Sequence, residues 1–158
     1  VIQNNQYIDA EQYEGIIISP GPSNPTNAGT SLEYLKNYIG KKPIFGVCLG
    51  MQVIGHHLGY EVSRAKTIQH GKKDKIQHNE KSVIFKGLPK EFEVVRYHSL
   101  TVKLNDQRLI ANASSDQEVM ALEDNDLKVY GVQFHPESIA SEYGDLLVKN
   151  FINICRSK

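Results

Sequence analysis

Cys48 lies in the pentapeptide Gly-Val-Cys-Leu-Gly at residues 46–50, which matches the G-x-S-x-G nucleophile pattern with cysteine in place of serine. In that pattern a strand turns abruptly into a helix, so glycines are needed where the backbones before and after the turn approach each other. The partial positive charge of a helix N-terminus favours a thiolate at the apex. We expect Cys48 to be a nucleophile, although the pentapeptide alone fits a buried structural cysteine equally well.

A cysteine nucleophile needs a nearby base and a group that orients this base. His135 follows the apolar run 129–134, at the end of a strand where α/β sheets place their sites. Glu137 lies two residues further on, so its carboxylate can return to one ring nitrogen and leave the other nitrogen free to take a proton. The pattern predicts a Cys48–His135–Glu137 triad, and an exposed turn at residues 135–137 is the alternative.

The other histidines are weaker candidates for the base. His56 and His57 are adjacent on the predicted helix, so at most one faces the sheet, and both are expected to be packing or surface residues. His78 is expected to be exposed in a polar turn, whereas His70 and His98 can be interpreted either way. We expect no metal centre, because His135 and Glu137 have no convincing third and fourth ligand.

The elements that must position these residues follow a strand-helix alternation in the first half of the chain. Apolar runs at 16–19 and 43–47 predict buried strands, each followed by an amphipathic helix, at 30–39 and from residue 51 to 58. This alternation indicates an α/β fold with a parallel sheet. The second half predicts a C-terminal helix at 142–155 and short strands at 83–85, 92–97, 101–104, 108–113, 119–122 and 128–134.

Length and composition restrict the classes of protein that the chain can represent. With 158 residues and a formal net charge of zero, residues 1–158 are expected to form a single domain with no bulk affinity for nucleic acid or membranes. No apolar run reaches transmembrane length. The two cysteines fit a reducing compartment, so a cytoplasmic location is expected. The basic stretch within residues 64–81 is interpreted as a solvated face, with docking of a partner or an anion as the alternative.

Five motifs in order resemble those of the class I (triad) glutamine amidotransferases. The motifs are Ser-Pro-Gly-Pro at 19–22, the cysteine segment 46–52, Gln-His-Gly-Lys at 69–72, Arg-Tyr-His-Ser-Leu at 96–100 and Gly-Val-Gln-Phe-His-Pro-Glu-Ser at 131–138. In detail they are similar to the small subunits that serve chorismate-using enzymes, namely anthranilate synthase and aminodeoxychorismate synthase. The resemblance implies a flavodoxin-like fold with a mostly parallel central sheet and additional short antiparallel strands in the second half.

The resemblance also implies roles for individual residues. Cys48 would attack the side-chain amide of L-glutamine, with His135 as the acid and base and Glu137 as its orienting group. Backbone N–H groups of Gly21 and Leu49 would hold the oxyanion. The residues implied in glutamine binding are Gly21, Pro22, Ser23, Gln52, Ser99 and Leu100. No cofactor is implied for such a protein.

The chain departs from the family pattern at two places. Ser23 stands where the family commonly has glycine, and a serine would be strained there if that position requires a positive φ. The family also begins with a strand and a helix that precede the first residues here, so we expect the chain to be N-terminally incomplete. Residues 1–5 are expected to be a strand end, with a gap in the sheet between this strand and the strand at residue 16.

The function implied is hydrolysis of L-glutamine to glutamate and ammonia, with the ammonia passed to a larger chorismate-binding synthase chain. Anthranilate synthesis is favoured, and aminodeoxychorismate synthesis is the alternative within the class. A catalytically silent assembly or regulatory module on the same fold is the alternative from another class. The intact residues Cys48, His135 and Glu137 argue against this last possibility.

Overall fold

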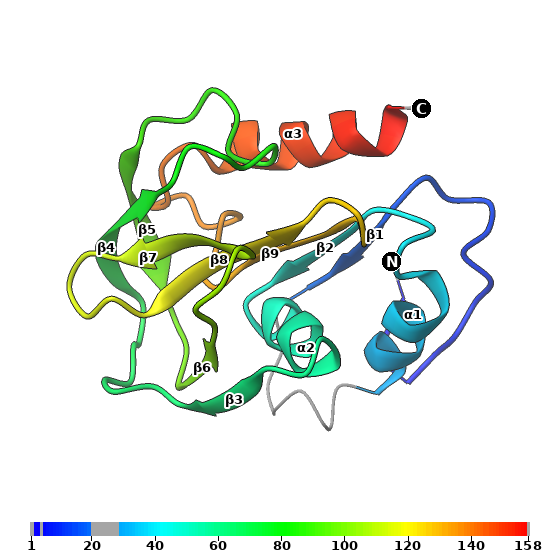
Figure 1. The fold of residues 1–158 in the computed structure, drawn as a ribbon, viewed down its shortest axis with the longest axis horizontal. Helices are drawn as coiled ribbons and strands as arrows, with labels where there is room; N and C mark the ends of the chain where they lie inside the picture. The colour runs from blue at the N-terminus through cyan, green and yellow to red at the C-terminus, as the bar shows by residue number, and fades with distance from the viewer. Residues whose placement is uncertain (1, 4, 20–28, 158) are drawn as a thin grey trace.

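The computed structural model describes residues 2–3, 5–19 and 29–157, and these form a mixed α/β fold (Figure 1). The helices are α1 (Thr30–Tyr38), α2 (Leu49–His57) and α3 (Gly144–Arg156). The strands are β1 (Ile16–Ile18), β2 (Ile44–Val47), β3 (Glu61–Arg64), β4 (Lys72–His78), β5 (Glu91–Arg96), β6 (Leu100–Lys103), β7 (Leu109–Ala113), β8 (Val119–Asp124) and β9 (Val129–Val132). The α/β class expected from the sequence is confirmed.

Within the described residues, seven strands form one sheet in the order β1-β2-β9-β8-β7-β4-β5. The pairs β1–β2 and β2–β9 are parallel, and the remaining pairs are antiparallel. The sheet is therefore mixed rather than mostly parallel, and most of the short strands of the second half extend the sheet itself. Short connections favour this result, because antiparallel neighbours can be joined by tight turns whereas parallel ones need long crossovers.

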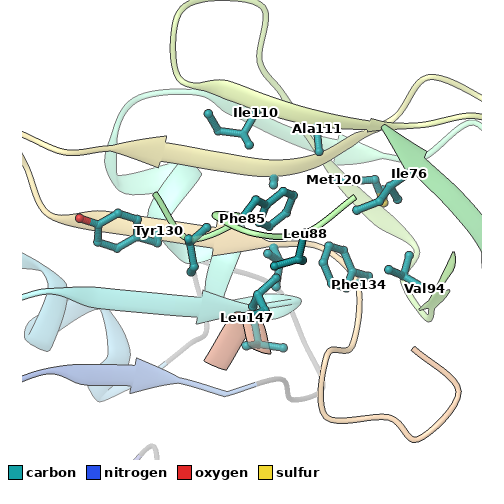
Figure 2. Close-up of a cluster of buried hydrophobic side chains, with 14 of the residues drawn as sticks. Ile76, Phe85, Leu88, Val94, Ile110, Ala111, Met120, Tyr130, Phe134 and Leu147 are labelled. Carbon is teal, nitrogen blue, oxygen red and sulfur yellow. The ribbon is translucent and has the colours of Figure 1, made fainter. Parts of the chain in front are cut away.

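Helices cover both faces of the sheet (Figure 1). α3 lies across one face, where Leu147 and Phe151 join a buried cluster that includes Phe85 and Phe134 (Figure 2). α1, α2 and the small β3–β6 sheet lie on the other face, over a second cluster centred on Ile44 and Ile54. The interior strand β2, which lies between β1 and β9, is buried along its whole length. A strand covered on both faces requires the continuous apolar run that the sequence has at this place.

Residues 83–85 do not form the strand expected there. They belong to a turn whose backbone N–H groups are held by side chains: the Ser82 hydroxyl accepts from Ile84 and Phe85, and the Glu123 carboxylate accepts from Val83. The apolar run still reaches the core, because Ile84 and Phe85 are fully buried. The strand prediction was wrong since a short apolar run can be buried without pairing in a ladder.

The predicted first strand is not seen at residues 2, 3 and 5, which the structure places outside any strand. Val1 and Asn4 lie outside the described residues, so the expected gap between two strands stays a prediction. β1 is the terminal strand of the sheet as described, and its middle residue Ile17 is 53% exposed.

The turn from β2 into α2 brings two glycines into contact. A Cβ atom on Gly46 would lie 2.4 Å from the carbonyl carbon of Gly50, and one on Gly50 would lie 2.2 Å from the carbonyl oxygen of Ile18. Between them Cys48 has φ 55° and ψ −102°, in the strained region that residues with side chains rarely adopt. The sharp turn expected from the pentapeptide is confirmed, and we call residues 46–50 the elbow.

A buried arginine anchors the segment that follows β5. The Arg96 side chain is fully buried, with Nη1 2.7 Å from Asp74 Oδ2 on β4 and Nη2 3.0 Å from Asp116 Oδ2 in the β7–β8 turn. Its Nε donates to His98 Nε2 at 3.3 Å, and His98 Nδ1 lies 2.8 Å from the Leu100 carbonyl. A carbonyl only accepts, so Nδ1 carries the proton and His98 is held in one orientation. The bonded chain therefore fixes the backbone of residues 97–100.

Replacing Gly50 with alanine tests the elbow packing. We expect Gly50→Ala to lower the free energy of unfolding by about 1–3 kcal/mol, because its Cβ would displace the backbone of β1. Gly131→Ala on β9 is the matched control, and it should cost less, because the atoms nearest its Cβ belong to the side chains of Met51 and Leu122, at 2.9 Å or more, and not to the backbone at 2.2 Å. Urea unfolding measures both. An unaltered stability of Gly50→Ala would contradict the packing described.

Removing the Arg96 side chain tests the buried ion pairs. Arg96→Met should destabilise the protein by about 3 kcal/mol, because it leaves two carboxylates without their cation. Both carboxylates are only 14% exposed. Lys75→Met breaks an exposed pair with Glu91 on the same two strands and should cost less than about 1 kcal/mol. Thermal unfolding compares the two variants, and equal losses would refute a special contribution from Arg96.

Candidate active site

Cys48 lines a pocket of about 190 Å³. The pocket is lined by residues of three segments that are distant in sequence: Cys48, Leu49 and Gln52 of the elbow and α2; Ile68, Gln69 and His70; and Tyr97, His98, Ser99 and Leu100. Four predicted site residues, Leu49, Gln52, Ser99 and Leu100, thus line the same cavity as Cys48. This arrangement depends on tertiary packing, because the third segment is placed by the Arg96 anchor.

Among the described residues, two hydrogen-bond partners face the sulfur of Cys48. It lies 3.6 Å from the Tyr97 carbonyl oxygen, to which the thiol donates, and 3.5 Å from Nε2 of Gln133, which donates to the sulfur. Its own backbone N–H is held by the Val132 carbonyl on β9. Cys48 is 7% exposed, so its thiol faces the pocket from an almost fully buried position.

His135 and Glu137 form the interaction that the sequence predicted. Nδ1 of His135 lies 3.0 Å from Oε1 of Glu137, so the carboxylate fixes the tautomer in which Nδ1 carries the proton. The other ring nitrogen, Nε2, is buried and has no hydrogen-bond partner within the described part of the chain. The imidazole also meets the Tyr97 ring edge-on, with centroids 6.5 Å apart. His135 is thereby left with one free acceptor nitrogen, as general-base chemistry requires.

Tyr97 connects the nucleophile and the histidine. Its carbonyl accepts from Cys48, and its ring contacts the rings of His135 and His70. The backbone N–H of His135 donates to the Val95 carbonyl of β5, which ties the histidine loop to the same strand that leads into Tyr97. β5 therefore supports both sides of the site.

Burial dominates the electrostatics of the thiol. Burial raises the pKa of Cys48 to about 11, and the negative charge of Glu137 adds to this rise. Hydrogen bonds from the Leu49 backbone N–H and from Gln133 act in the opposite direction and lower the pKa. The helix N-terminus was expected to favour a thiolate, but desolvation outweighs it in the free site. Cys48 therefore rests as a neutral thiol at neutral pH.

Gln52 and Gln133 form a buried pair of amides beside the thiol. Gln52 Nε2 donates to the Leu100 carbonyl at 3.3 Å and to Gln133 Oε1 at 3.2 Å. Gln52 is 4% exposed, so it is a buried residue and not a polar residue of the surface. Gln133 was not singled out from the sequence. Its position in the motif at 131–138, just after β9, is the one signal that could have drawn attention to it.

The remaining histidine predictions have different outcomes. His56 and His57 are exposed, as expected. The prediction for His78 was wrong: it is 5% exposed on β4, with Nε2 2.8 Å from the Pro89 carbonyl and its ring against Phe85. His98 is a buried structural residue, whereas His70 is exposed at the pocket rim.

The remaining predictions concern residues 21–23, the basic stretch within residues 64–81, membrane-spanning helices and metal sites. Gly21, Pro22 and Ser23 lie outside the described residues, so their predicted contacts stay predictions. The basic residues between positions 64 and 81 are exposed, which agrees with a solvated face. Among residues 2–3, 5–19 and 29–157, no helix is long and apolar enough to cross a membrane, and no cluster of three His, Cys, Asp or Glu side chains could hold a metal ion.

Comparison with known proteins places the chain in a family. The model of the family "Glutamine amidotransferase class-I" matches residues 1–155. The chain is 42% identical to the aminodeoxychorismate/anthranilate synthase component 2 of Bacillus subtilis, over 100% of this chain and 85% of the relative. It is also 42% identical to the aminodeoxychorismate synthase component 2 of Escherichia coli, over 92% of this chain and 79% of the relative.

The fold agrees with these sequence relationships. A crystal structure of a GMP synthase protein from Thermoplasma acidophilum superposes with a TM-score of 0.86 at 29% identity, covering 98% of this chain and 79% of that one. The match of the family model to nearly the whole chain and the identity to these relatives show that the protein belongs to the class-I glutamine amidotransferases.

Proposed function

We propose that the chain is the glutamine-hydrolysing subunit of a chorismate-using synthase and that Cys48, His135 and Glu137 are its catalytic residues. The observation that supports this most is the combination of a strained Cys48 at the elbow with a His135–Glu137 pair whose second ring nitrogen is free. The names of the relatives from Bacillus subtilis and Escherichia coli support a chorismate-using synthase as the chain that accepts the ammonia. The proposed reaction requires no cofactor.

In the first half of the proposed reaction, Cys48 transfers its proton to Nε2 of His135 and its sulfur attacks the side-chain carboxamide carbon of glutamine. The resulting oxyanion accepts hydrogen bonds from backbone N–H groups, for which Leu49 and Gly21 are the candidates. The carbon–nitrogen bond then breaks while His135 returns the proton to the departing nitrogen. The products of this half are ammonia and a γ-glutamyl thioester on Cys48.

In the second half, a water molecule attacks the thioester and His135 takes its proton. The carbon–sulfur bond breaks, glutamate leaves, and the thiol of Cys48 is restored. Glu137 stays ionised throughout and stabilises the imidazolium that forms twice in the cycle. Gln52, Ser99 and Leu100, which line the pocket with Cys48, are proposed to bind the α-amino and α-carboxylate groups of glutamine.

Ammonia protonates readily in water, so the protein would be useful only when it is docked on the larger chain that consumes ammonia. Anthranilate synthesis is the favoured acceptor reaction, in line with component 2 relatives such as that of Lactococcus lactis. Aminodeoxychorismate synthesis is the second candidate, because the Escherichia coli relative carries that name alone. A cytoplasmic location is part of the proposal.

Reconstitution with the large synthase chain tests the function. We expect Cys48→Ala to abolish glutamine-dependent product formation, by about 1000-fold or more, and to leave synthesis from added ammonia intact. Cys155→Ser, which removes the other cysteine, is the matched control and should retain activity. The product, anthranilate or aminodeoxychorismate, identifies the acceptor reaction. Undiminished glutamate release by Cys48→Ala would refute the assignment of the nucleophile.

The raised pKa of Cys48 predicts how the thiol of the free protein reacts. In Cys155→Ser protein, the rate of alkylation by iodoacetamide should rise with pH, by about tenfold per unit between roughly pH 7.5 and 9.5, because the thiolate is a minor species below its pKa of about 11. Mass spectrometry of quenched samples measures this rate. A rate that is already constant across this interval would mean that the thiolate predominates, contrary to the expectation.

A further inference from the structure

Gln133 has a position that the proposed triad does not explain. Its side chain is fully buried, and it follows β9 directly, two residues before His135. Its backbone N–H donates to the Met120 carbonyl of β8, so the residue is held against the sheet. A buried amide carries a desolvation cost unless its donors and acceptor are used, so its partners indicate its role.

The neighbours of Gln133 determine which end of its amide faces the thiol. Gln52 Nε2 donates to Gln133 Oε1, which must therefore be the oxygen end. The nitrogen end then points at Cys48, with Nε2 3.5 Å from the sulfur. Gln52 is itself oriented by the Leu100 carbonyl, which only accepts. A chain of three hydrogen bonds thus runs from the pocket wall to the sulfur and leaves a donor directed at it.

We propose that Gln133 is a catalytic residue: its side-chain N–H stabilises the negative charge that develops on the Cys48 sulfur, and Gln52 holds this donor in the required orientation. The inference rests on the proposed function, because it assigns a partner to the same nucleophile. A donor is worth more against a charged acceptor than against a neutral one, so the bond strengthens as the thiol loses its proton.

The Gln133 donor offsets part of the cost that burial adds to ionising Cys48. The thiol is almost fully buried, and the negative charge of the Glu137 carboxylate also disfavours the thiolate. His135 is the proposed proton acceptor, and the ionisable side chains other than Cys48 that line the pocket, among the described residues, are His70, His98 and the Tyr97 hydroxyl. His98 is held neutral by burial, which lowers its pKa. Within the part of the chain that the structure describes, the Leu49 N–H and the Gln133 amide favour the thiolate without carrying a charge themselves.

The same donor fits the departure of the sulfur from the thioester. When water has attacked, the carbon–sulfur bond breaks and the electron pair returns to sulfur before His135 protonates it. A fixed amide N–H at the sulfur stabilises that leaving thiolate, as it does the attacking one. Gln133 is therefore expected to affect kcat more than KM, because it contacts the reacting sulfur and is not among the residues that line the pocket.

Titration of Cys48 in a Cys155→Ser background tests the proposal directly, with cysteine labelled by ¹³C at Cβ and observed by NMR. Gln133→Met keeps the length of the side chain and removes the donor, and it should raise the midpoint of the titration by about one pH unit. Gln133→Glu keeps an oxygen for Gln52 and presents a negative charge to the sulfur, and it should raise the midpoint further. If Gln133 only filled space, the two substitutions would not raise the midpoint of the titration in this order.

Gln77→Met is the matched control, because Gln77 is exposed on β4 and should leave the midpoint unchanged. Circular dichroism of each variant verifies that it is folded, and Gln133→Met, which is apolar and of similar size, serves if Gln133→Glu does not fold. An unchanged midpoint in folded Gln133→Met would overturn the inference and leave the proposed function standing. In the reconstituted synthase, Gln133→Met should lower glutamine-dependent kcat by about tenfold, with KM altered less than about twofold.

The two proposals fail in distinguishable ways. The variants could show the expected shift of the midpoint while the wild-type chain releases no glutamate with any large synthase chain. This outcome would refute the proposed function and leave the Gln133–Cys48 interaction standing. A fall in kcat together with an equal fall in folded fraction, and no shift of the midpoint, would identify Gln133 as a structural residue and contradict the proposal.

Discussion

The close approach of Gly46 and Gly50 is the constraint on which the rest of the site depends. No side chain fits at either position, since a Cβ would lie within 2.5 Å of backbone atoms. The two glycines allow β2 to pass into α2 without a loop, and the cost is the strained backbone of Cys48. Strain at one residue is tolerated because the flanking strand and helix are embedded in the two cores, which prevents the turn from relaxing.

The same packing that holds the thiol also makes it difficult to ionise. Residues of the elbow are buried, so the neutral thiol is favoured in the free protein, and burial raises its pKa to about 11. Activation must therefore come from directed donors and from a base that becomes charged only during the reaction. Fixed hydrogen-bond donors suit a nucleophile in a site that excludes water, because their dipoles need not reorganise when charge develops.

The candidate active site, which is the pocket together with the residues that face the Cys48 sulfur and the histidine loop, is assembled from segments that different parts of the fold hold in place. The elbow and α2 supply Cys48 and Gln52, the segment after β9 supplies Gln133 and His135, and β5 leads into the backbone of residues 97–100. The buried Arg96 connects β5 to β4 and to the β7–β8 turn through Asp74 and Asp116. The antiparallel half of the sheet therefore has a role in the site, because it positions the pocket residues 97–100.

The elbow, the His135–Glu137 pair and the class of fold could be predicted from the sequence alone, because each of these depends on residues close together in the chain. Short stretches of sequence contain all three signals: the spacing of the elbow glycines, the two-residue separation of His135 and Glu137, and the apolar periodicity of the strands and helices. The tertiary structure was needed to find that residues 83–85 form a buried turn and that His78 and His98 are structural. It alone showed that Gln133 faces the sulfur, since that orientation depends on Gln52 and Leu100, which the fold brings together from distant parts of the chain.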